Sequence, residues 1–267
     1  MLAKWLNAKY YNTKYVPVPI DEYLVYDRSI YPVSTSSAFF KTASQLNSTQ
    51  PLSNISPNRE IQPSNHHELR NPVSNAVVSL AVETANAGYG ALIFCGGRQG
   101  CQSTALLVSE AMPGGSDVNI ETLDKRKDVV SDLRSLSVGL DDTLGKTVIR
   151  GVAFHHAGLT VEERDIVAEA YDKGVINVIV ATCSLAAGIN LPARRVILQG
   201  ARMGKDLIGP AMLRQMRGRA GRKGKVEVGE SYLCCQKADL AEAAQLLEAD
   251  LPMVESCLTP EKRGIKR

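Results

Sequence analysis

The chain has 267 residues, 44% of them hydrophobic and 22% charged, and its formal net charge at pH 7 is +3. This balance is typical of a globular protein with one large or two small domains, and so small a net charge does not identify a partner. The six cysteines form no C-x-x-C pair and only four histidines accompany them, so neither a zinc site nor a disulfide framework is expected. No apolar run approaches the length of a membrane span, and a soluble, intracellular protein is expected.

Residues 34–71 differ in composition from the rest of the chain. Ser, Thr, Asn, Gln and Pro dominate there, and the apolar residues are scattered. Such a stretch cannot bury enough apolar surface to offset its conformational entropy. It is therefore predicted to be a disordered insertion between a short N-terminal piece, 1–33, and the main domain, 72–250.

The main domain is predicted to begin with a helix and a short buried strand. Apolar residues at helical spacing run from Val77 to Val82, and Gly88 ends the pattern. The apolar run Ala91–Cys95 is bounded by glycines, which is typical of a buried parallel strand. A second helix is predicted over 102–112.

The clearest strand–helix–strand unit lies between residues 151 and 182. Thr160 and Glu163 form the pattern of a capping box at the start of its helix, and Gly174 ends that helix. Further along the chain, strands and helices continue to alternate, which predicts an α/β fold with an open parallel sheet covered on both faces. The strands predicted from residue 151 onward are 152–154, 175–181, 195–198 and 231–234.

Ligands of such a sheet gather at the carboxyl ends of its strands, and two segments of unusual composition are predicted there. The first is 181–192, in which Gly188 and small residues allow the backbone to approach a ligand. Thr182, Ser184 and Asn190 add short polar side chains that suit phosphate oxygens. A tight strand-to-helix turn that only packs closely explains the composition equally well.

The second segment is 215–222, Gln-Met-Arg-Gly-Arg-Ala-Gly-Arg, in which arginines alternate with glycines and small residues. The guanidinium fork pairs with phosphate oxygens, and glycine removes side chains that would be in the way. This pattern predicts an arginine finger for phosphoryl transfer. A basic patch that contacts nucleic acid without catalysis is the alternative.

Taken together, these segments resemble the motifs of superfamily 2 DNA helicases, in the Ski2-like branch of polymerase theta-type and related repair helicases. The resemblance covers almost the whole chain except the insertion, and several long motifs occur in the family's order. It implies that the chain is a second, RecA-like motor domain. By the same resemblance, 1–33 is the linker and first strand leaving a first motor domain, and 251–267 begins a winged-helix domain. The segments that match are 5–8, 17–19, 91–101, 151–159, 181–192, 215–222 and 256–258.

The resemblance also implies roles for individual residues. Arg219 and Arg222 would reach the γ-phosphate of ATP, and Gln215 would join the same cleft. The other residues near the nucleotide would be Gly188, Asn190, Gly218 and Gly221. Single-stranded or forked DNA would be contacted by Thr182, Ser184, His156 and Gly158. For His155 and His156, hydrogen-bonded scaffold is the expected role rather than catalysis, and Arg217 is left out of the catalytic set.

ATP with Mg²⁺ would be held mainly by a first motor domain, because the chain lacks the parts for it. The segment Gly139–Thr147 has five residues between its glycines instead of four, and no apolar strand precedes it, so it is rejected as a phosphate loop. Asp21 and Glu22 are predicted to be a surface pair, and no metal ligand is assigned. The family's arginine before Pro-Val-Pro is replaced by Val16.

Three interpretations of the chain follow. It is a fragment of a full helicase, which is favoured, or one piece of a motor that a partner completes. Alternatively, it is a nucleic-acid-binding or interaction module without ATPase activity. A nuclear location and a role in DNA repair are implied by the resemblance alone.

Overall fold

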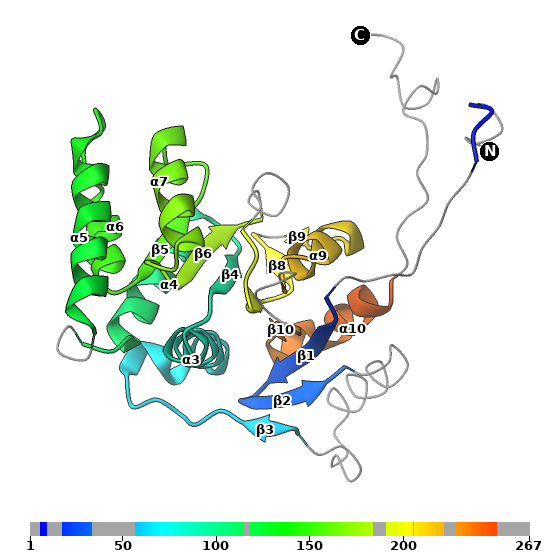
Figure 1. The fold of residues 1–267 in the computed structure, drawn as a ribbon. Helices are drawn as coiled ribbons and strands as arrows, with labels where there is room; N and C mark the ends of the chain where they lie inside the picture. The colour runs from blue at the N-terminus through cyan, green and yellow to red at the C-terminus, as the bar shows by residue number, and fades with distance from the viewer. Residues whose placement is uncertain are drawn as a thin grey trace.

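The computed structural model places most of the chain in one α/β domain (Figure 1). The residues that it describes are 6–9, 18–33, 57–114, 118–183, 191–204, 206–221 and 228–249.

The main sheet has eight strands in the order β3-β2-β1-β10-β7-β4-β6-β5. Neighbouring strands are parallel throughout the run β1-β10-β7-β4-β6-β5. Beyond β1, the strands β2 and β3 extend the sheet by antiparallel pairing. The predicted parallel α/β fold is therefore confirmed, with a small antiparallel edge added. The strands are β1 (Ile20–Tyr26), β2 (Ser29–Pro32), β3 (Arg59–Glu60), β4 (Ala91–Cys95), β5 (Val152–His155), β6 (Val178–Thr182), β7 (Arg195–Gln199) and β10 (Gly229–Cys234).

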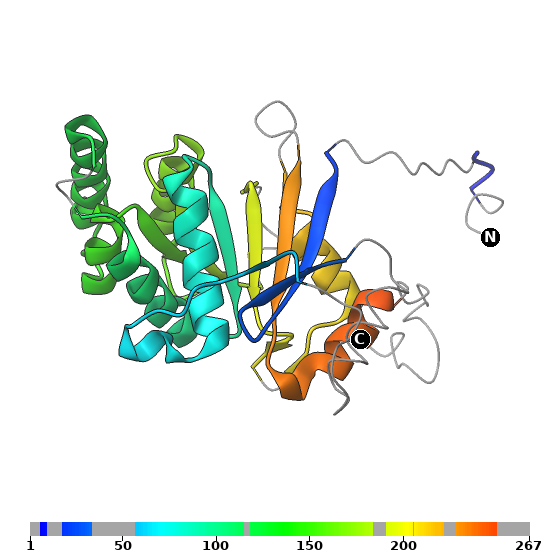
Figure 2. The same cartoon turned by 90° about the horizontal axis from the view of Figure 1, so that it is seen from below.

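Helices cover both faces of this sheet. Figure 2 shows the strands β7, β10 and β1 between α3 on one side and α9 on the other. Next to α3, α4 packs against β5 and β6. A two-stranded hairpin, β8 (Arg202–Met203) and β9 (Asp206–Leu207), follows β7. The helices are α3 (Pro72–Asn86), α4 (Arg98–Ala111), α5 (Ile120–Ser135), α6 (Asp142–Ile149), α7 (Val161–Asp172), α9 (Pro210–Arg217) and α10 (Leu240–Glu248), and the 3₁₀ turns are η1 (His67–Arg70) and η3 (Lys237–Asp239).

Local signals set the ends of several elements, and for α7 the sequence predicts both signals; α4 begins four residues before the predicted 102, and β6 begins three residues after the predicted 175. The Asn71 side chain caps α3 by accepting from the N–H of Val73, and the Thr160–Glu163 capping box is present in both directions. Gly174 has a φ of +73°, which an L side chain rarely adopts, and it ends α7. All five residues of β4 are buried, as expected of a central parallel strand.

Two differences from the predicted elements concern the segment between β4 and β5. Helices α5 and α6 are not predicted, because α5 has only two buried residues, Arg126 and Leu133, and therefore lacks a clear apolar stripe. The rejected phosphate loop lies mostly in α6, which begins after its cap residue Asp141 and follows a helix rather than a strand. A helical backbone cannot wrap its amides around a phosphate as that loop does.

Much of the predicted insertion, 34–71, lies outside the described residues. Its last part is described, and it is ordered against the sheet through β3 and η1. Ile61 and Leu69 are buried there, and the Asn75 side chain of α3 donates a hydrogen bond to the Gln62 carbonyl at 2.9 Å. This short stretch is thereby joined to the core.

Candidate nucleotide and nucleic-acid interface

Strands β4, β5 and β6 end side by side at the carboxyl edge of the sheet. Cys95 pairs with Thr182, and His155 pairs with Ala181, so the segments that follow these strands lie near one another. They include the predicted DNA-contacting residues Thr182, His156 and Gly158. The prediction that segment 181–192 begins at the carboxyl end of a strand is confirmed.

The backbone turn after β5 packs around the His156 side chain. This side chain is buried, its Nδ1 accepts the Gly158 N–H at 3.1 Å, and its ring stacks on Phe154 with the centroids 5.1 Å apart. A Cβ on Gly158 would lie 3.0 Å from His156 Nδ1 and 3.3 Å from Arg98 Cδ, so only glycine fits without a shift of neighbours. Burial lowers the pKa of His156. His156 therefore shapes this turn, and the exposed backbone of Gly158 is what the turn presents.

His155 faces the interior, where its Nε2 has no hydrogen-bond partner among the described residues. Burial is the main cause that lowers its pKa to about 4, below the ordinary value of 6.5. The unfolded chain consequently binds a proton more readily than the folded one, and stability present above pH 6.5 is lost as the pH falls towards 4.

From pH 7 to pH 4.5 this one group is expected to lower the free energy of unfolding by about 2 to 3 kcal/mol. Urea unfolding at the two pH values measures it. The His155→Phe variant should lose this part of the pH dependence, and the exposed His67→Gln should keep it. An unchanged pH dependence in His155→Phe would contradict the assignment.

A pocket of about 420 Å³ opens at the carboxyl ends of β4 and β7. Helix α4 begins beside it after Gly97, and no side chain caps its first turn. The Gln199 side chain is fixed there, because its Oε1 accepts from the Cys95 thiol and the Thr104 hydroxyl, each at 2.9 Å. Uncapped N–H groups at a helix start are donors for an anion.

The segment 215–222 occupies the opposite edge of the sheet, and the prediction that it follows a strand's carboxyl end is wrong. Arg219 and Gly221 pair with Ala193, which precedes β7: the Ala193 N–H donates to the Arg219 carbonyl at 2.9 Å, and the Gly221 N–H donates to the Ala193 carbonyl at 2.8 Å. The reason is topological. Helix α9 connects the parallel strands β7 and β10, so it runs back across the sheet and ends at their amino ends.

Glycine is required at the end of this segment. Gly221 has a φ of +83°, and a Cβ there would lie 2.6 Å from Val18 Cγ1. Gly218 is the C-cap residue of α9, where a Cβ would lie 3.1 Å from the Arg214 carbonyl oxygen. Gln215 is exposed and Arg219 is partly exposed, so both side chains reach solvent at this edge.

Four predicted site residues lie outside the described part of the chain: Ser184, Gly188, Asn190 and Arg222.

Sequence reasoning missed the contact between Glu22 and Arg217 and therefore misjudged Glu22. Glu22 is not part of a surface pair, because its Oε2 accepts from Arg217 Nη1 at 2.6 Å and the two side chains are only 28% and 21% exposed. Asp21 is exposed, as predicted. Nothing in the sequence signals this pair, since its members lie 195 positions apart.

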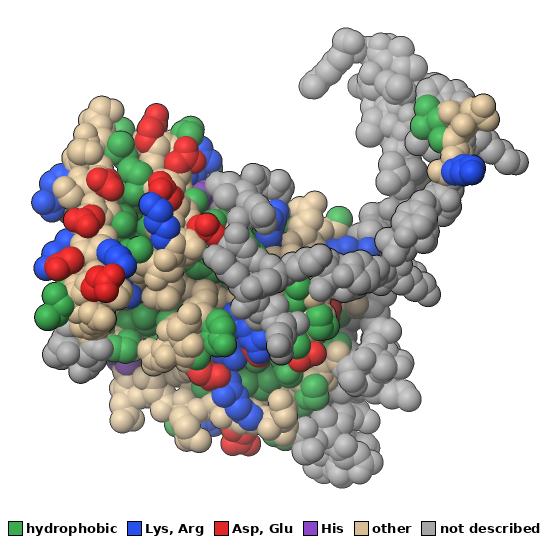
Figure 3. All heavy atoms as spheres, in the orientation of Figure 1, with side chains coloured by type: hydrophobic (Ala, Val, Ile, Leu, Met, Phe, Trp, Pro, Cys, Tyr) green, Lys and Arg blue, Asp and Glu red, His purple; other side chains and the backbone are tan. Residues whose placement is uncertain are grey.

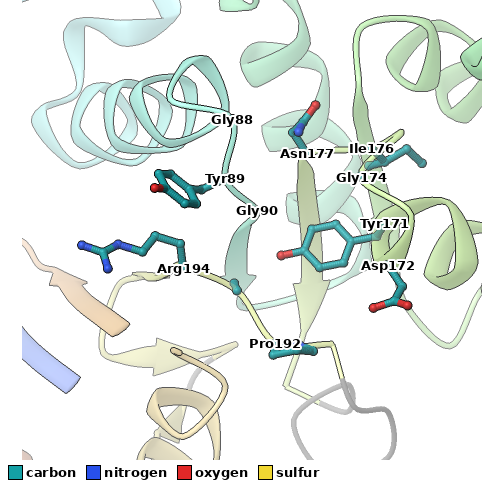
Figure 4. A pocket seen from close by; sticks show the side chains of 11 residues that line it. Gly88, Tyr89, Gly90, Tyr171, Asp172, Gly174, Ile176, Asn177, Pro192 and Arg194 are labelled. Atoms are coloured by element: carbon teal, nitrogen blue, oxygen red, sulfur yellow. The ribbon is translucent and has the colours of Figure 1, made fainter. Parts of the chain in front are cut away.

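A second pocket, of about 310 Å³, lies at the amino ends of β4 and β6 (Figure 4). The Tyr171 ring forms one wall, and its hydroxyl lies against Gly90, where a Cβ would be only 2.5 Å away. Ala193 lines this pocket too, so the pocket borders the residue that pairs with Arg219. None of the described site residues lines it.

The described site residues suit the phosphate groups of a nucleotide better than its metal ion. Arginine and glycine in 215–221 suit phosphate oxygens, whereas no group of His, Cys, Asp or Glu that could hold a metal occurs in the described ranges. Over α5 and α7, Figure 3 shows acidic and basic side chains intermixed, so that face is no basic patch for nucleic acid. No helix within the described residues is both long enough and apolar enough to cross a membrane.

Comparison with known proteins identifies two family models. The model described as helicase conserved C-terminal domain matches residues 130–224, and one described as helix-turn-helix domain matches 229–267. The second match starts at β10, which is the last strand of the main sheet.

Similar full-length proteins are much longer than this chain. Mouse DNA polymerase theta (Mus musculus) is 34% identical over 97% of the chain and 10% of its own length. Human helicase POLQ-like (Homo sapiens) is 32% identical over 99% of the chain and 23% of its own length. The ATP-dependent DNA helicase Hel308 of Pyrobaculum calidifontis is 36% identical over 64% of the chain and 25% of its own length. The chain thus spans a quarter or less of these relatives.

Proposed function

The chain carries a helicase C-terminal domain of the Ski2-like family that includes polymerase theta and Hel308, and we propose that it is the second motor domain of an ATP-dependent DNA helicase. Its family is one of ATP-dependent helicases. The role of the individual residues, the DNA substrate and a nuclear location in DNA repair are part of the proposal.

The observation that carries this proposal is the pairing of Ala193 with Arg219 and Gly221. Segment 181–192 starts at the carboxyl edge of the sheet and is followed directly by Ala193 at the amino edge. One end of that segment therefore adjoins the proposed DNA-contacting residues, and the other adjoins the arginine segment. Such a connection between two sites is what a motor needs to couple them.

At the nucleotide side, Arg219 and Arg222 would donate to the γ-phosphate oxygens, where they stabilise the charge of the transition state. Gln215 would bind in the same cleft. The glycines Gly188, Gly218 and Gly221 would allow the backbone to approach the phosphates, and Asn190 would bind in the same cleft. Bound ATP with Mg²⁺ would supply the free energy for movement, and a first motor domain would hold the metal and most of the nucleotide.

At the DNA side, Thr182, Ser184 and the backbone around Gly158 would contact the phosphodiester chain, while His156 supports the turn. Backbone contacts position the strand and carry no sequence information. The helix-turn-helix match over 229–267 supports DNA binding at this end of the chain. The start of a winged-helix domain at 251–267 is part of the proposal. The division into 1–33, 34–71, 72–250 and 251–267 remains part of this proposal.

Binding of single-stranded DNA by the 267-residue chain is expected to be salt-sensitive and independent of sequence. If about four phosphates are contacted, the affinity should fall about 50-fold between 50 and 200 mM salt. Fluorescence anisotropy with oligo-dT and with a mixed sequence measures both properties. Thr182→Val should weaken binding, whereas Ser131→Ala on the distant surface of α5 should not; salt-independent binding would contradict backbone contact.

The alternative function, a binding module without ATPase activity, predicts the same DNA binding. The two functions differ once a first motor domain is present. The proposed motor domain supports DNA-stimulated ATP hydrolysis in that assembly, and the module does not.

A further inference from the structure

Glu22 of β1 holds the end of α9, which carries the proposed arginine segment. Its carboxylate lies 2.6 Å from Arg217 Nη1, and both side chains are largely buried. Among the described residues, Arg217 has no second acceptor, and its Nε is buried without a partner. A partly buried guanidinium with a single acceptor is held in position mainly by that acceptor. Glu22 therefore fixes where the last turn of α9 meets β1.

The same N-terminal stretch contacts the arginine segment a second time. Val18 lies against Gly221, so closely that a Cβ on this glycine would be 2.6 Å from Val18 Cγ1. The Gly229 N–H donates to the Pro19 carbonyl at 2.8 Å, and from Ile20 onward β1 runs in register with β10. Arg219 thus stands between two contacts with β1 and its lead-in, one at position 217 and one at position 221.

We propose that Glu22 is a positioning residue for the arginine finger Arg219, acting through Arg217. The inference rests on the proposed function, because it assigns Arg219 to the nucleotide. Glu22 itself does not contact ATP. The phosphates of ATP tolerate little misplacement of a catalytic group, since a shift of about 1 Å can cost roughly 100-fold in rate. Loss of Glu22 should consequently slow turnover while the nucleotide still binds.

The test uses ATP hydrolysis by a complete helicase in which this chain is joined to its first motor domain. Glu22→Gln is expected to lower kcat by about 10- to 100-fold and to leave KM for ATP within about twofold. Arg217→Gln should do the same. The double variant should be no slower than either single variant, because both changes remove one interaction. Asp21→Asn, next to Glu22 on the exposed side of β1, is the matched control and should keep wild-type kcat.

Several outcomes would overturn the inference. If Arg219→Ala abolishes turnover but Glu22→Gln keeps wild-type kcat, Glu22 has no positioning role and the proposed function stands. Turnover that survives Arg219→Ala removes the proposed function and this inference together. Additive losses in the double variant, or a kcat loss that matches the loss of folded protein by circular dichroism, would show a merely structural role. Should Glu22→Gln fail to fold, the comparison of Arg217→Gln with wild type decides by the same criteria.

Discussion

Replacement of Arg219 or Arg222 by alanine in the complete helicase is expected to abolish ATP turnover and to leave ATP binding largely intact. An arginine finger stabilises charge that develops only in the transition state, and its loss typically costs roughly 10³- to 10⁵-fold in kcat. Binding should survive, because the first motor domain would hold most of the nucleotide. Steady-state kinetics and equilibrium binding of a fluorescent ATP analogue measure the two quantities.

The matched control for this experiment is Arg214→Ala. Arg214 lies on α9, which leads into the arginine segment, and it is exposed, so its removal changes the charge of the chain by the same amount. The backbone contacts of Arg219 with Ala193 involve no side-chain atoms and are retained in Arg219→Ala. Unchanged turnover in both Arg219→Ala and Arg222→Ala would remove the central claim about mechanism. An equal loss in Arg214→Ala would assign the effect to overall charge.

A second large effect is expected at Arg126, a buried cation that binds neutral oxygens. Only 4% of this residue is exposed, and burial lowers its pKa. Its guanidinium donates to the Val175 carbonyl at 3.1 Å, the Ile149 carbonyl at 3.4 Å and Asn177 Oδ1 at 3.3 Å. Ile149 is the last residue of α6, so the negative end of that helix dipole favours the cation. Arg126 thereby joins α5 to the ends of α6 and α7.

Arg126→Met is therefore expected to lower the free energy of unfolding by about 3 to 5 kcal/mol. The methionine fills much of the space but leaves buried carbonyl oxygens without donors, and each such group costs about 1 to 3 kcal/mol. Urea unfolding of the 267-residue chain measures the change. Arg134→Met, an exposed position on the same helix, should change stability by less than about 0.5 kcal/mol. Equal stability of the two variants would show that Arg126 has no such role.

Gly151 is tied to the same arginine. It has a φ of +79°, and a Cβ there would collide with the Arg126 guanidinium. Glycine is therefore required before β5 for two reasons: the positive φ, and the space that the Arg126 side chain of α5 occupies. Its place at the head of segment 151–159 is explained by its backbone conformation together with this packing.

The sequence by itself determined the elements whose signals are local. The apolar run of β4, the capping box of α7 and the glycine that ends that helix act within a few residues, so each could be recognised without knowledge of the fold. The order and composition of 181–192 and of the arginine segment were also sufficient to identify the family, and the comparisons agree with that identification. Polar α5 gave no such signal, because its only buried cation looks like a surface residue until its partners are known.

Tertiary structure alone decided where these segments lie relative to one another. The sequence places 181–192 after a strand, but only the crossover of α9 shows that Arg219 and Gly221 lie at the amino ends of the strands, beside Ala193. Likewise, Glu22 and Arg217 are 195 positions apart and meet because β1 pairs with β10 in the sheet. The physical reason is the range of the forces: backbone propensity and capping act over one helical turn, whereas strand order and the burial of a charged pair depend on packing of the whole chain.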